Sequence, residues 1–287
     1  MSVRGASPAR ADEFLRWFHD AHPGATTRGF ADARDGGGRS SYDRLAERVL
    51  AGDRGRGDIV DLGCGDGYLL ERLRQRGVPA GRLVGIDMSA GELARARARP
   101  ALAGVRLLHE RATAMSAAFA APGAAAVCSH LGFMVMGEPE AVVAEIARVL
   151  APGGRFATIV GGGPSAEDPV FERFLALLQA ACVSAGVRSP RLGHLRQRSD
   201  SGLRALFGPH SGFVAEVEID DFVLALDGSV GALWQRLASA YELALLSDAQ
   251  RAALRARFER EVARFADGRG VIPCRAAMRQ VVCRRRS

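Results

Sequence analysis

Residues 58–68 of this chain, which read DIVDLGCGDGY, decide its fold. The first five residues are mostly apolar and predict a strand, the next five contain three glycines, and a helix-like pattern follows. A second apolar run, residues 82–87, ends on the acid Asp87. This order of strand, glycine-rich turn, helix and acid-terminated strand predicts a nucleotide-binding βαβ unit. In such a unit the acid accepts hydrogen bonds from a ribose.

The spacing of the glycines favours a ligand without a diphosphate. A dinucleotide-binding turn reads G-x-G-x-x-G, with the pyrophosphate at the helix N-terminus. The turn here reads G-x-G-x-G, and Tyr68 stands where the third glycine of that fingerprint would be. Asp61 lies just before the turn, where its charge would oppose a diphosphate. A carboxylate there suits an ammonium group, and S-adenosylmethionine (SAM) has an ammonium, a sulfonium and a ribose but no phosphate.

Three motifs in order resemble class I SAM-dependent methyltransferases of the small-molecule, natural-product type. They are DLGCGDG at 61–67, VGID at 84–87 and VLAPGGRF at 149–156, and the resemblance covers about residues 40–160. It implies a Rossmann-like α/β fold: a doubly wound, mostly parallel sheet of seven strands in the order 3-2-1-4-5-7-6, ending in an antiparallel hairpin. It also implies methyl transfer from SAM, with S-adenosylhomocysteine as the product.

The resemblance places the cofactor on the ends of the first three strands. Asp61 accepts from the SAM ammonium, the glycines of the turn let the backbone approach the ligand, and Asp87 accepts from the ribose. Met88 packs on the adenine. The complete set of predicted cofactor residues is Asp61, Gly63, Cys64, Gly65, Gly67, Asp87, Met88, Ala112, Ser129 and Tyr42.

Structural alternatives stay open for several of these residues. Asp87 could cap the next helix, although Ser89 could do this itself. Met88 and Tyr42 could be packing residues, and the glycines could serve only a tight turn. In the family an acid commonly stands where this chain has Arg111, which cannot accept a hydrogen bond. The expected adenine contact is therefore the backbone of Ala112, with a displaced Glu110 as the alternative.

His130 is the catalytic candidate. It follows the fourth predicted strand, residues 124–129, and in this fold such residues lie between cofactor and substrate. Methylation of an oxygen or nitrogen releases a proton, and the pKa of histidine suits its uptake near neutral pH. The alternative is that His130 only orients SAM or the substrate. Phe133 and Met134 are predicted to contact the substrate, with ordinary core packing as their alternative.

The chain is interpreted as a single methyltransferase domain, residues 1–287, with added segments at the ligand edge. Residues 1–40 are predicted to form an N-terminal lid. Insertions at about 164–200 and 228–268 are predicted to form a helical cap. The expectation is a closed small-molecule pocket at the carboxyl edge of the sheet. The alternative is helical padding without a role in substrate choice. At the start of the core, Ser41 is expected to cap a helix over residues 42–50.

Composition narrows the class of partner. The net charge of +7 and the pI near 9.9 raise nucleic-acid binding as a hypothesis, but every basic side chain besides histidine is arginine, as a GC-rich genome favours. Most of these arginines alternate with acids on predicted helices, which indicates a solvated surface and disfavours a nucleic-acid partner. The runner-up function is methylation of RNA or protein. A third reading is a SAM-binding protein of this fold without methyl transfer.

The sequence contains no pattern typical of a metal site, a membrane span or a signal peptide. The five cysteines are scattered without metal-ligand spacing, so reduced thiols and no metal are expected. No apolar run is as long as a membrane span, and the N-terminus lacks the apolar core of a signal peptide, which predicts a cytoplasmic protein. Nothing in the sequence indicates an oligomeric state. The sequence thus predicts methylation of an O or N atom of a small, partly hydrophobic metabolite of the kind made in secondary metabolism.

Overall fold

One sheet of seven strands runs through the part of the chain that the structure describes, in the order β3-β2-β1-β4-β5-β7-β6. The structure is a computed structural model that describes residues 8–53, 55–115, 119, 122–163, 168–188 and 191–287. The strands are β1 Asp58–Leu62, β2 Leu83–Asp87, β3 Arg106–His109, β4 Ala124–His130, β5 Leu150–Gly163, β6 Phe213–Ala225 and β7 Arg275–Arg285. β1 to β5 are parallel, and β7 runs antiparallel to both β5 and β6. The predicted fold class, strand order and antiparallel pair are confirmed.

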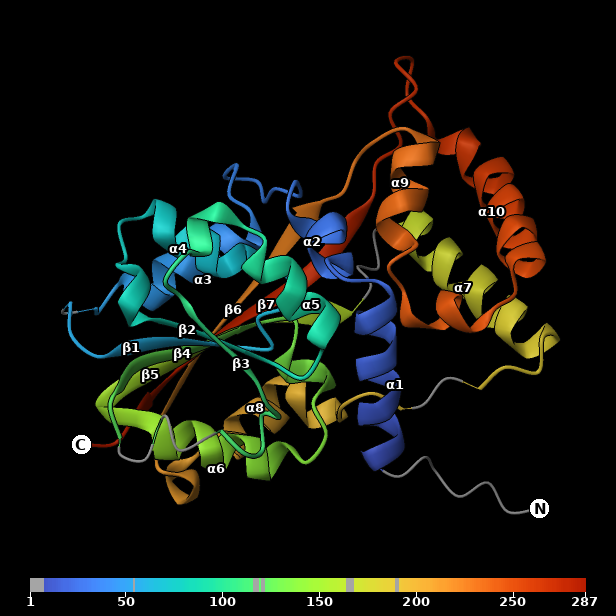
Figure 1. Cartoon of the computed structure of the whole chain (residues 1–287). Coiled ribbons are helices and arrows are strands. Elements are labelled where there is room, and N and C mark those ends of the chain that lie inside the picture. The colour runs from blue at the N-terminus through green and yellow to red at the C-terminus, as the bar shows by residue number, and fades with distance from the viewer. Residues whose placement is uncertain (1–7, 54, 116–118, 120–121, 164–167, 189–190) are drawn as a thin grey trace.

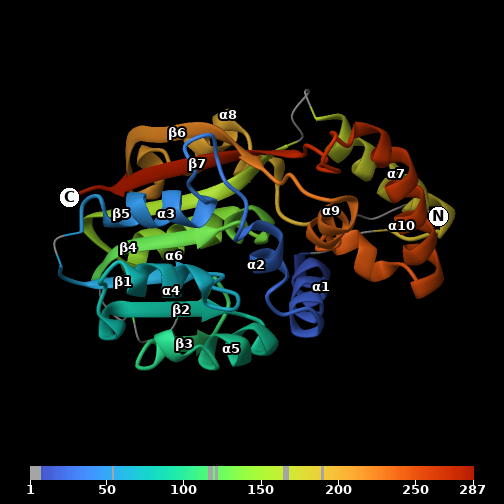
Figure 2. The ribbon, with the colours of Figure 1, turned by 90° about the horizontal axis from the view of Figure 1, so that it is seen from above.

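Helices cover both faces of this sheet, as Figures 1 and 2 show. One face carries α3 (Ser41–Leu50), α4 (Tyr68–Gln75) and α5 (Ala90–Arg97), and the other carries α6 (Pro139–Val149) and α8 (Asp200–Leu206). Successive strand residues enter opposite layers: Ile59 packs with the first group and Val60 with the second. Because both faces are buried, the parallel strands read as continuous apolar runs.

The start of α3 differs from the prediction by one residue. Ser40, not Ser41, is the N-cap: its side chain accepts from the backbone N–H of Asp43, and Asp43 accepts in return from the N–H of Ser40. Ser41 lies inside the first turn, and its hydroxyl is free to reach His130. The expectation that Ser89 caps α5 is confirmed, since its hydroxyl accepts from the N–H of Glu92.

A third group of helices stands beyond the carboxyl ends of the parallel strands, beside α1 (Figure 2). It consists of α7 (Pro169–Ser184), α9 (Val230–Leu237) and α10 (Asp248–Val262). Their mutual core contains three aromatic rings, those of Phe174, Trp234 and Phe258, with centroids 5.7 to 6.3 Å apart. The second predicted insertion does not begin with one long helix, because α9 ends at Leu237 and a separate 3₁₀ turn, η7 (Tyr241–Leu245), follows. Residues 164–167, at the start of the first predicted insertion, lie outside the described residues.

The N-terminal segment forms two helices, α1 (Pro8–Ala21) and α2 (Ala25–Phe30). Gly24, with φ near +75°, lets the chain turn directly from one helix into the next. Residues 1–7 of the predicted lid lie outside the described residues. The remaining short 3₁₀ turns are η1 Ala80–Arg82, η2 Pro100–Leu102, η4 Phe133–Val135, η5 Leu195–Gln197, η6 Pro209–Ser211 and η8 Ala263–Phe265.

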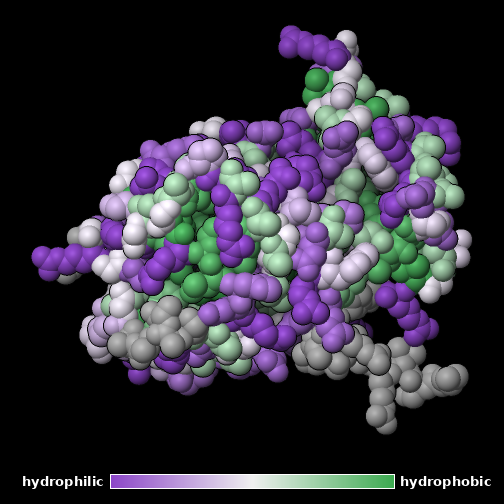
Figure 3. All heavy atoms as spheres, in the orientation of Figure 1, coloured by the Kyte–Doolittle hydropathy of each residue, from purple (hydrophilic) through white to green (hydrophobic). Residues whose placement is uncertain are grey.

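The surface of the molecule is mixed in hydropathy on the face that Figure 3 draws. On the face drawn in Figure 3, hydrophilic side chains are spread among smaller hydrophobic areas. Among the described residues, no helix is both long and apolar enough to cross a bilayer.

Candidate functional site

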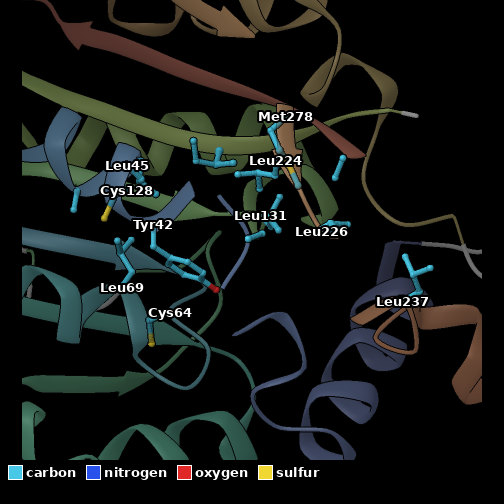
Figure 4. Close-up of a cluster of buried hydrophobic side chains, with 14 of the residues drawn as sticks. Tyr42, Leu45, Cys64, Leu69, Cys128, Leu131, Leu224, Leu226, Leu237 and Met278 are labelled. Carbon is cyan, nitrogen blue, oxygen red and sulfur yellow. The ribbon is translucent and has the colours of Figure 1, made fainter. Parts of the chain in front are cut away.

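A pocket lies at the carboxyl ends of β1, β2 and β4, with α1, α2 and η7 contributing to its wall. Ten predicted residues line it: Asp61, Gly63, Cys64, Gly65, Asp87, Met88, Ala112, His130, Met134 and Tyr42. In Figure 4, Tyr42 is seen with Cys64 on one side and Leu131 on the other. The fold therefore brings most of the predicted site together at the edge where ligands bind in open α/β sheets.

Asp61 is a buried acid whose side chain has no hydrogen-bond partner among the described residues. It is 1% exposed, and neither of its oxygens has a hydrogen-bond partner in the described part of the chain. Burial and the nearby acids Asp87 and Asp66 raise its pKa to about 8. A buried acid of this kind requires a cationic or hydrogen-donating ligand. The ammonium of SAM fits this requirement.

The turn glycines have two different roles. Gly63 and Gly65 adopt φ values near +70° and +53° and lie on the pocket wall. Gly67 also has a positive φ, but it is not part of the wall. A Cβ at Gly67 would lie 2.4 Å from Leu102 Cδ1, so this glycine permits close packing of the turn rather than approach to a ligand. The prediction that Gly67 contacts the cofactor is therefore not supported by its position.

Asp87 is hydrogen-bonded to the backbone of the glycine turn and also lines the pocket. One carboxylate oxygen accepts from the N–H of Gly65 and the other from the N–H of Ser89, both at 2.8 Å. Each oxygen keeps a lone pair that a ribose hydroxyl can reach. Burial raises the pKa of Asp87, and the two N–H donors oppose that rise. Both readings of this residue, as a local anchor and as a ribose acceptor, are compatible with its geometry.

At the predicted adenine end, Met88 and Ala112 lie on the wall together with Arg111. Arg111, which stands where the family commonly has an acid, forms an ion pair with Asp12 of α1. Burial of Asp12 raises the pKa of its carboxyl, and the guanidinium opposes this rise. Arg111 thus connects the third strand to the N-terminal helix. Sequence reasoning missed this role because the partner lies 99 residues away.

His130 is enclosed by α3. Its Nε2 lies 2.8 Å from the hydroxyl of Ser41, and its ring stacks on that of Tyr42 with centroids 3.7 Å apart. Nδ1 has no hydrogen-bond partner among the described residues. Burial lowers the pKa of His130 to about 3, so the imidazole is neutral near pH 7. This favours an orienting role over proton uptake, and the catalytic assignment remains a prediction.

Two predicted residues, one near the end of β4 and one just beyond it, belong to the core instead. Ser129 is fully buried; its hydroxyl donates to Leu62 O and accepts from the N–H of Phe133, at 2.7 and 3.0 Å. Phe133 packs against Phe156 and Phe207 on the far side of the sheet. Neither side chain reaches the pocket, so the predicted cofactor contact of Ser129 and substrate contact of Phe133 are not supported. Met134 does line the pocket, with its sulfur 3.0 Å from the N–H of Gly161.

Several wall residues were not assigned from the sequence. They come from α1, α2, α5 and η7, and include Phe18, His19, Thr27, Phe30, Glu92 and Tyr241. The lid and the second predicted insertion thus both contribute to the wall. The first insertion acts indirectly: Gln197 donates to the carbonyls of Phe133 and Met136, the latter at 3.0 Å, and so braces the turn after β4.

No group of three or more His, Cys, Asp or Glu side chains among the described residues is arranged to hold a metal ion. The absence of a metal cofactor remains a prediction. The cysteines of the described ranges, including Cys64 in the pocket wall, are free thiols. Burial and nearby carboxylates raise the pKa of Cys64 well above its ordinary value, which makes it a poor nucleophile.

Comparison with known proteins agrees with this geometry. A family model described as a methyltransferase domain matches residues 59–154, which hold β1 to β4 and the glycine turn. Residues 59–154, about a third of the chain, thus match a methyltransferase domain, and the sheet has the fold of class I SAM-dependent methyltransferases.

Methyltransferases of other organisms are similar over the same core. The ubiquinone biosynthesis O-methyltransferase of Sodalis glossinidius is 34% identical over 98 residues, which cover 34% of this chain and 38% of that protein. An uncharacterized methyltransferase of Mycobacterium bovis is 32% identical over 124 residues, covering 43% and 59% of the two chains. The matches thus span between 38% and 59% of these two relatives.

Solved structures extend the likeness of the fold beyond the matched core. The [4+2]-cyclase SpnF has a TM-score of 0.54 at 18% identity, with 100% of this chain and 98% of that chain covered. The YcgJ protein of Bacillus subtilis has a TM-score of 0.52 at 16% identity, covering 86% and 98%. At these identities the likeness shows the shared methyltransferase-type fold alone.

Proposed function

We propose that this chain transfers the methyl group of SAM to an oxygen or nitrogen atom of a small, uncharged, partly hydrophobic metabolite. The observation that carries the proposal is a pocket in which a buried acid, Asp61, and a half-buried acid, Asp87, are continuous with an apolar wall. The acids suit the cofactor, and the apolar wall suits an acceptor. The match of residues 59–154 to a methyltransferase domain supports the same reading.

The cofactor end of the pocket holds its ligand through complementary charge and hydrogen bonding. Asp61 has no hydrogen-bond partner among the residues that the structure describes, so an ammonium would complete its hydrogen bonding and stabilise its charged form. Asp87 is held in place by two backbone donors and can accept from a ribose. Bound SAM supplies an electrophilic methyl group on a sulfonium. The residues of this chain bind it, orient it and exclude water.

The acceptor end is mainly apolar. Leu15 of α1 and Phe30 of α2 contribute from the lid, and η4 and its flanks contribute from the sheet. The apolar side chains of this part of the wall are Leu15, Phe18, Phe30, Leu131, Met134, Val135 and Met136. Burial of an acceptor against them removes apolar surface from water and holds the reacting atom in place.

The charges of the pocket favour an uncharged acceptor. Six acidic side chains line the wall, and one of them, Asp66, is paired with Arg99 outside it. The six are Asp12, Asp61, Asp66, Asp87, Glu92 and Glu110. Arg111 is the one arginine among the described lining residues, and it is already paired with Asp12. A phosphate or carboxylate on the acceptor would therefore meet no unpaired guanidinium on this wall and would be repelled by the acids. The pocket is acidic although the whole chain has a net charge of +7.

His130 is proposed to orient the reactants as a neutral imidazole. Its Nε2 is held by Ser41 and its ring by Tyr42, while Nδ1 remains without a partner in the described structure. The single unfilled hydrogen-bonding position of Nδ1 could be used by an acceptor hydroxyl or amine. Proximity and orientation then supply most of the rate enhancement, and the released proton passes to water.

The proposal is tested in two steps. First, calorimetry with S-adenosylhomocysteine should show binding to the native protein and at least about a hundredfold weaker binding to Asp61→Asn, since a charged contact is lost. Asp58→Asn, which changes an acid of the same strand at the other end, is the matched control and should bind normally. Absence of binding to the native protein would overturn the proposal.

Second, methyl-tritiated SAM is incubated with the enzyme and an extract of the source organism, which is then separated into organic-soluble metabolites, RNA and protein. Enzyme-dependent label in the organic-soluble metabolites, lost in Asp61→Asn, is the expected result. Label in RNA or protein would contradict a small-molecule acceptor. Cofactor binding without label in any fraction would instead favour a protein of this fold that does not transfer methyl groups.

A further inference from the structure

A hydrogen-bonded chain of three side chains closes one side of the pocket. His19 Nδ1 of α1 lies 2.9 Å from Glu92 Oε1 of α5, and His19 Nε2 lies 3.2 Å from the hydroxyl of Tyr241 in η7. These residues are 73 and 222 positions apart in the sequence, and all three line the pocket. The core, the lid and the cap therefore meet at one hydrogen-bonded chain.

The chemistry of the three groups fixes the direction of the hydrogen bonds. A carboxylate only accepts, so Nδ1 of His19 carries the hydrogen that is donated to Glu92. In the neutral imidazole Nε2 is then an acceptor, and the Tyr241 hydroxyl donates to it. The oxygen of Tyr241 keeps its lone pairs and can accept a further hydrogen bond from a ligand in the pocket.

Glu92 is completely satisfied by the lid. It is 2% exposed, and its second oxygen accepts from the backbone N–H of Gly24 at 2.8 Å. A neighbouring contact fixes the same end of α1: one oxygen of Asp20 accepts from the hydroxyl of Ser89 at 2.7 Å and from the N–H of Gly91 at 3.0 Å. The position of His19 relative to α5 is thus determined at several points.

This chain of residues lies next to the predicted ribose acceptor. A Cβ at Gly65 would be 3.8 Å from the carboxylate of Glu92, and the N–H of Gly65 donates to Asp87. Burial raises the pKa of Asp87 most, and the charge of Glu92 raises it further. Burial is the main cause that raises the pKa of the Tyr241 hydroxyl, and the charge of Asp87 is the second. These groups therefore share the part of the pocket around Asp87.

Aromatic packing holds Tyr241 at this place. Its ring lies with its centroid 4.6 Å from that of Phe18 and 6.3 Å from that of Phe14, both in edge-to-face arrangements. Removal of the hydroxyl alone, in Tyr241→Phe, would leave this packing unchanged. The contribution of the hydroxyl can thus be separated from that of the ring.

We propose that Glu92, His19 and Tyr241 form the lid-side half of the site for the cofactor ribose. Asp87 accepts from the ribose on the sheet side, and the hydroxyl of Tyr241, oriented through His19 by Glu92, accepts from a ribose hydroxyl on the other side. Binding of the ribose then requires the lid and the cap to be closed together. This inference rests on the proposed function, because it takes the cofactor to be SAM.

The test compares S-adenosylhomocysteine with its 2′-deoxy and 3′-deoxy analogues by calorimetry. In the native protein, loss of the ribose hydroxyl that faces Tyr241 should weaken binding roughly three- to tenfold beyond the loss of its contact with Asp87. Tyr241→Phe should weaken binding of S-adenosylhomocysteine by a similar factor, and the extra penalty for one of the two deoxy analogues should disappear. His19→Gln should reproduce the effect in part, and His210→Gln, at an exposed position in η6, is the matched control.

Quenching of tryptophan fluorescence reports the position of the lid in a separate experiment. Trp17 on α1 is 48% exposed, and in a Trp234→Phe background it is the remaining tryptophan of the chain. Addition of S-adenosylhomocysteine should reduce quenching of Trp17 by acrylamide, and Tyr241→Phe should diminish this protection while leaving the melting temperature within about 2 °C.

Equal losses for S-adenosylhomocysteine and both deoxy analogues in Tyr241→Phe would overturn the ribose assignment. Unchanged affinity in both Tyr241→Phe and His19→Gln would also overturn it. Either result can occur in a protein that binds S-adenosylhomocysteine normally, and would leave the proposed function standing. Failure of the native protein to bind S-adenosylhomocysteine would overturn the proposed function itself.

Discussion

The imidazole of His130 stacks on the ring of Tyr42, with the two planes 17° apart, while the hydroxyl of the preceding residue, Ser41, holds its Nε2. Two consecutive residues of α3 therefore fix both the tilt and the rotation of the histidine. The same enclosure lowers the pKa of His130 to about 3 and leaves a neutral ring in the pocket. An imidazole fixed in this way orients a ligand better than it accepts a proton.

The first prediction concerns His130 and pH. Because the pKa is about 3 in the folded state and near 6.5 in an unfolded chain, the unfolded state binds more protons between these values. The stability of the native protein should therefore fall as pH decreases from about 6.5 towards 3, by up to about 1.4 kcal/mol per pH unit from this group. Urea denaturation at several pH values should show this dependence to be smaller in His130→Gln.

The turnover of the same variant separates the two roles of His130. Loss of a base should lower turnover about a hundredfold or more, as general-base catalysis contributes that much. Loss of an orienting group should raise the KM of the acceptor and lower turnover less, without a change in SAM affinity. A turnover profile of the native enzyme with an inflection near pH 6 to 7 that is absent in His130→Gln would contradict the orienting role.

The second prediction concerns proton release at Asp61. Without a ligand its pKa is about 8, so the carboxyl is mostly protonated at pH 7. Binding of an ammonium beside it favours the charged form and should release close to one proton per SAM bound. Calorimetry at pH 7 in buffers of different ionisation enthalpy measures this number directly. Asp61→Asn should bind weakly and release none.

The third prediction follows from the same carboxyl and concerns stability. Between about 3.8 and 8 the folded state holds a proton that the unfolded state has lost, so the stability of the ligand-free protein should decrease as pH rises through this window. The stability of Asp61→Asn should not depend on pH in this way, because an amide does not titrate. The variant should melt at a higher temperature than the native protein at pH 8, with a smaller difference at pH 5. A lower melting temperature for the variant at pH 8 would contradict the buried, unpaired state of Asp61.

Local sequence was sufficient to predict the sheet and its cofactor edge. The turn from Gly63 to Gly67 and the acid that ends β2 are set by neighbours a few residues apart, so motif spacing identified them. The N-cap of α3 was predicted one residue late because Ser40 and Ser41 are chemically equivalent in the sequence. Only the three-dimensional contact with His130 distinguishes them.

The residues at the end of β4 and those of the lid show which contacts could not be predicted from the sequence. Ser129 and Phe133 were predicted to line the pocket because of their position in the chain. The hydroxyl of Ser129 is instead hydrogen-bonded to the backbone, and the ring of Phe133 packs on the far side of the sheet. The contact of His19 with Glu92 and Tyr241 spans large separations in sequence. No periodicity or spacing predicts such a contact, because it depends on how the lid and cap fold back over the core.

The fourth prediction tests the hydrogen bond between Ser41 and His130. Ser41→Ala keeps the capping box of α3, which uses Ser40, but leaves a buried ring nitrogen without its partner. The free energy of unfolding should fall by about 1 to 3 kcal/mol. Ser40→Ala should lose about 1 kcal/mol through the cap alone. The two variants should differ in ligand binding: Ser41→Ala should weaken acceptor binding, and Ser40→Ala should not.

The last prediction separates packing from conformation at two glycines. Gly67 and Gly153 have nearly the same φ, near +78° and +73°. A Cβ at Gly67 would lie 2.4 Å from Leu102 and 3.1 Å from Ala96, whereas a Cβ at Gly153 would meet no heavy atom within 4 Å. Gly153→Ala should therefore cost only the backbone strain, about 1 kcal/mol, and Gly67→Ala about 2 kcal/mol or more beyond that. Because Gly67 lies outside the pocket wall, the folded fraction of Gly67→Ala should still bind S-adenosylhomocysteine. Loss of binding in a fully folded Gly67→Ala protein would instead show that this glycine serves the cofactor.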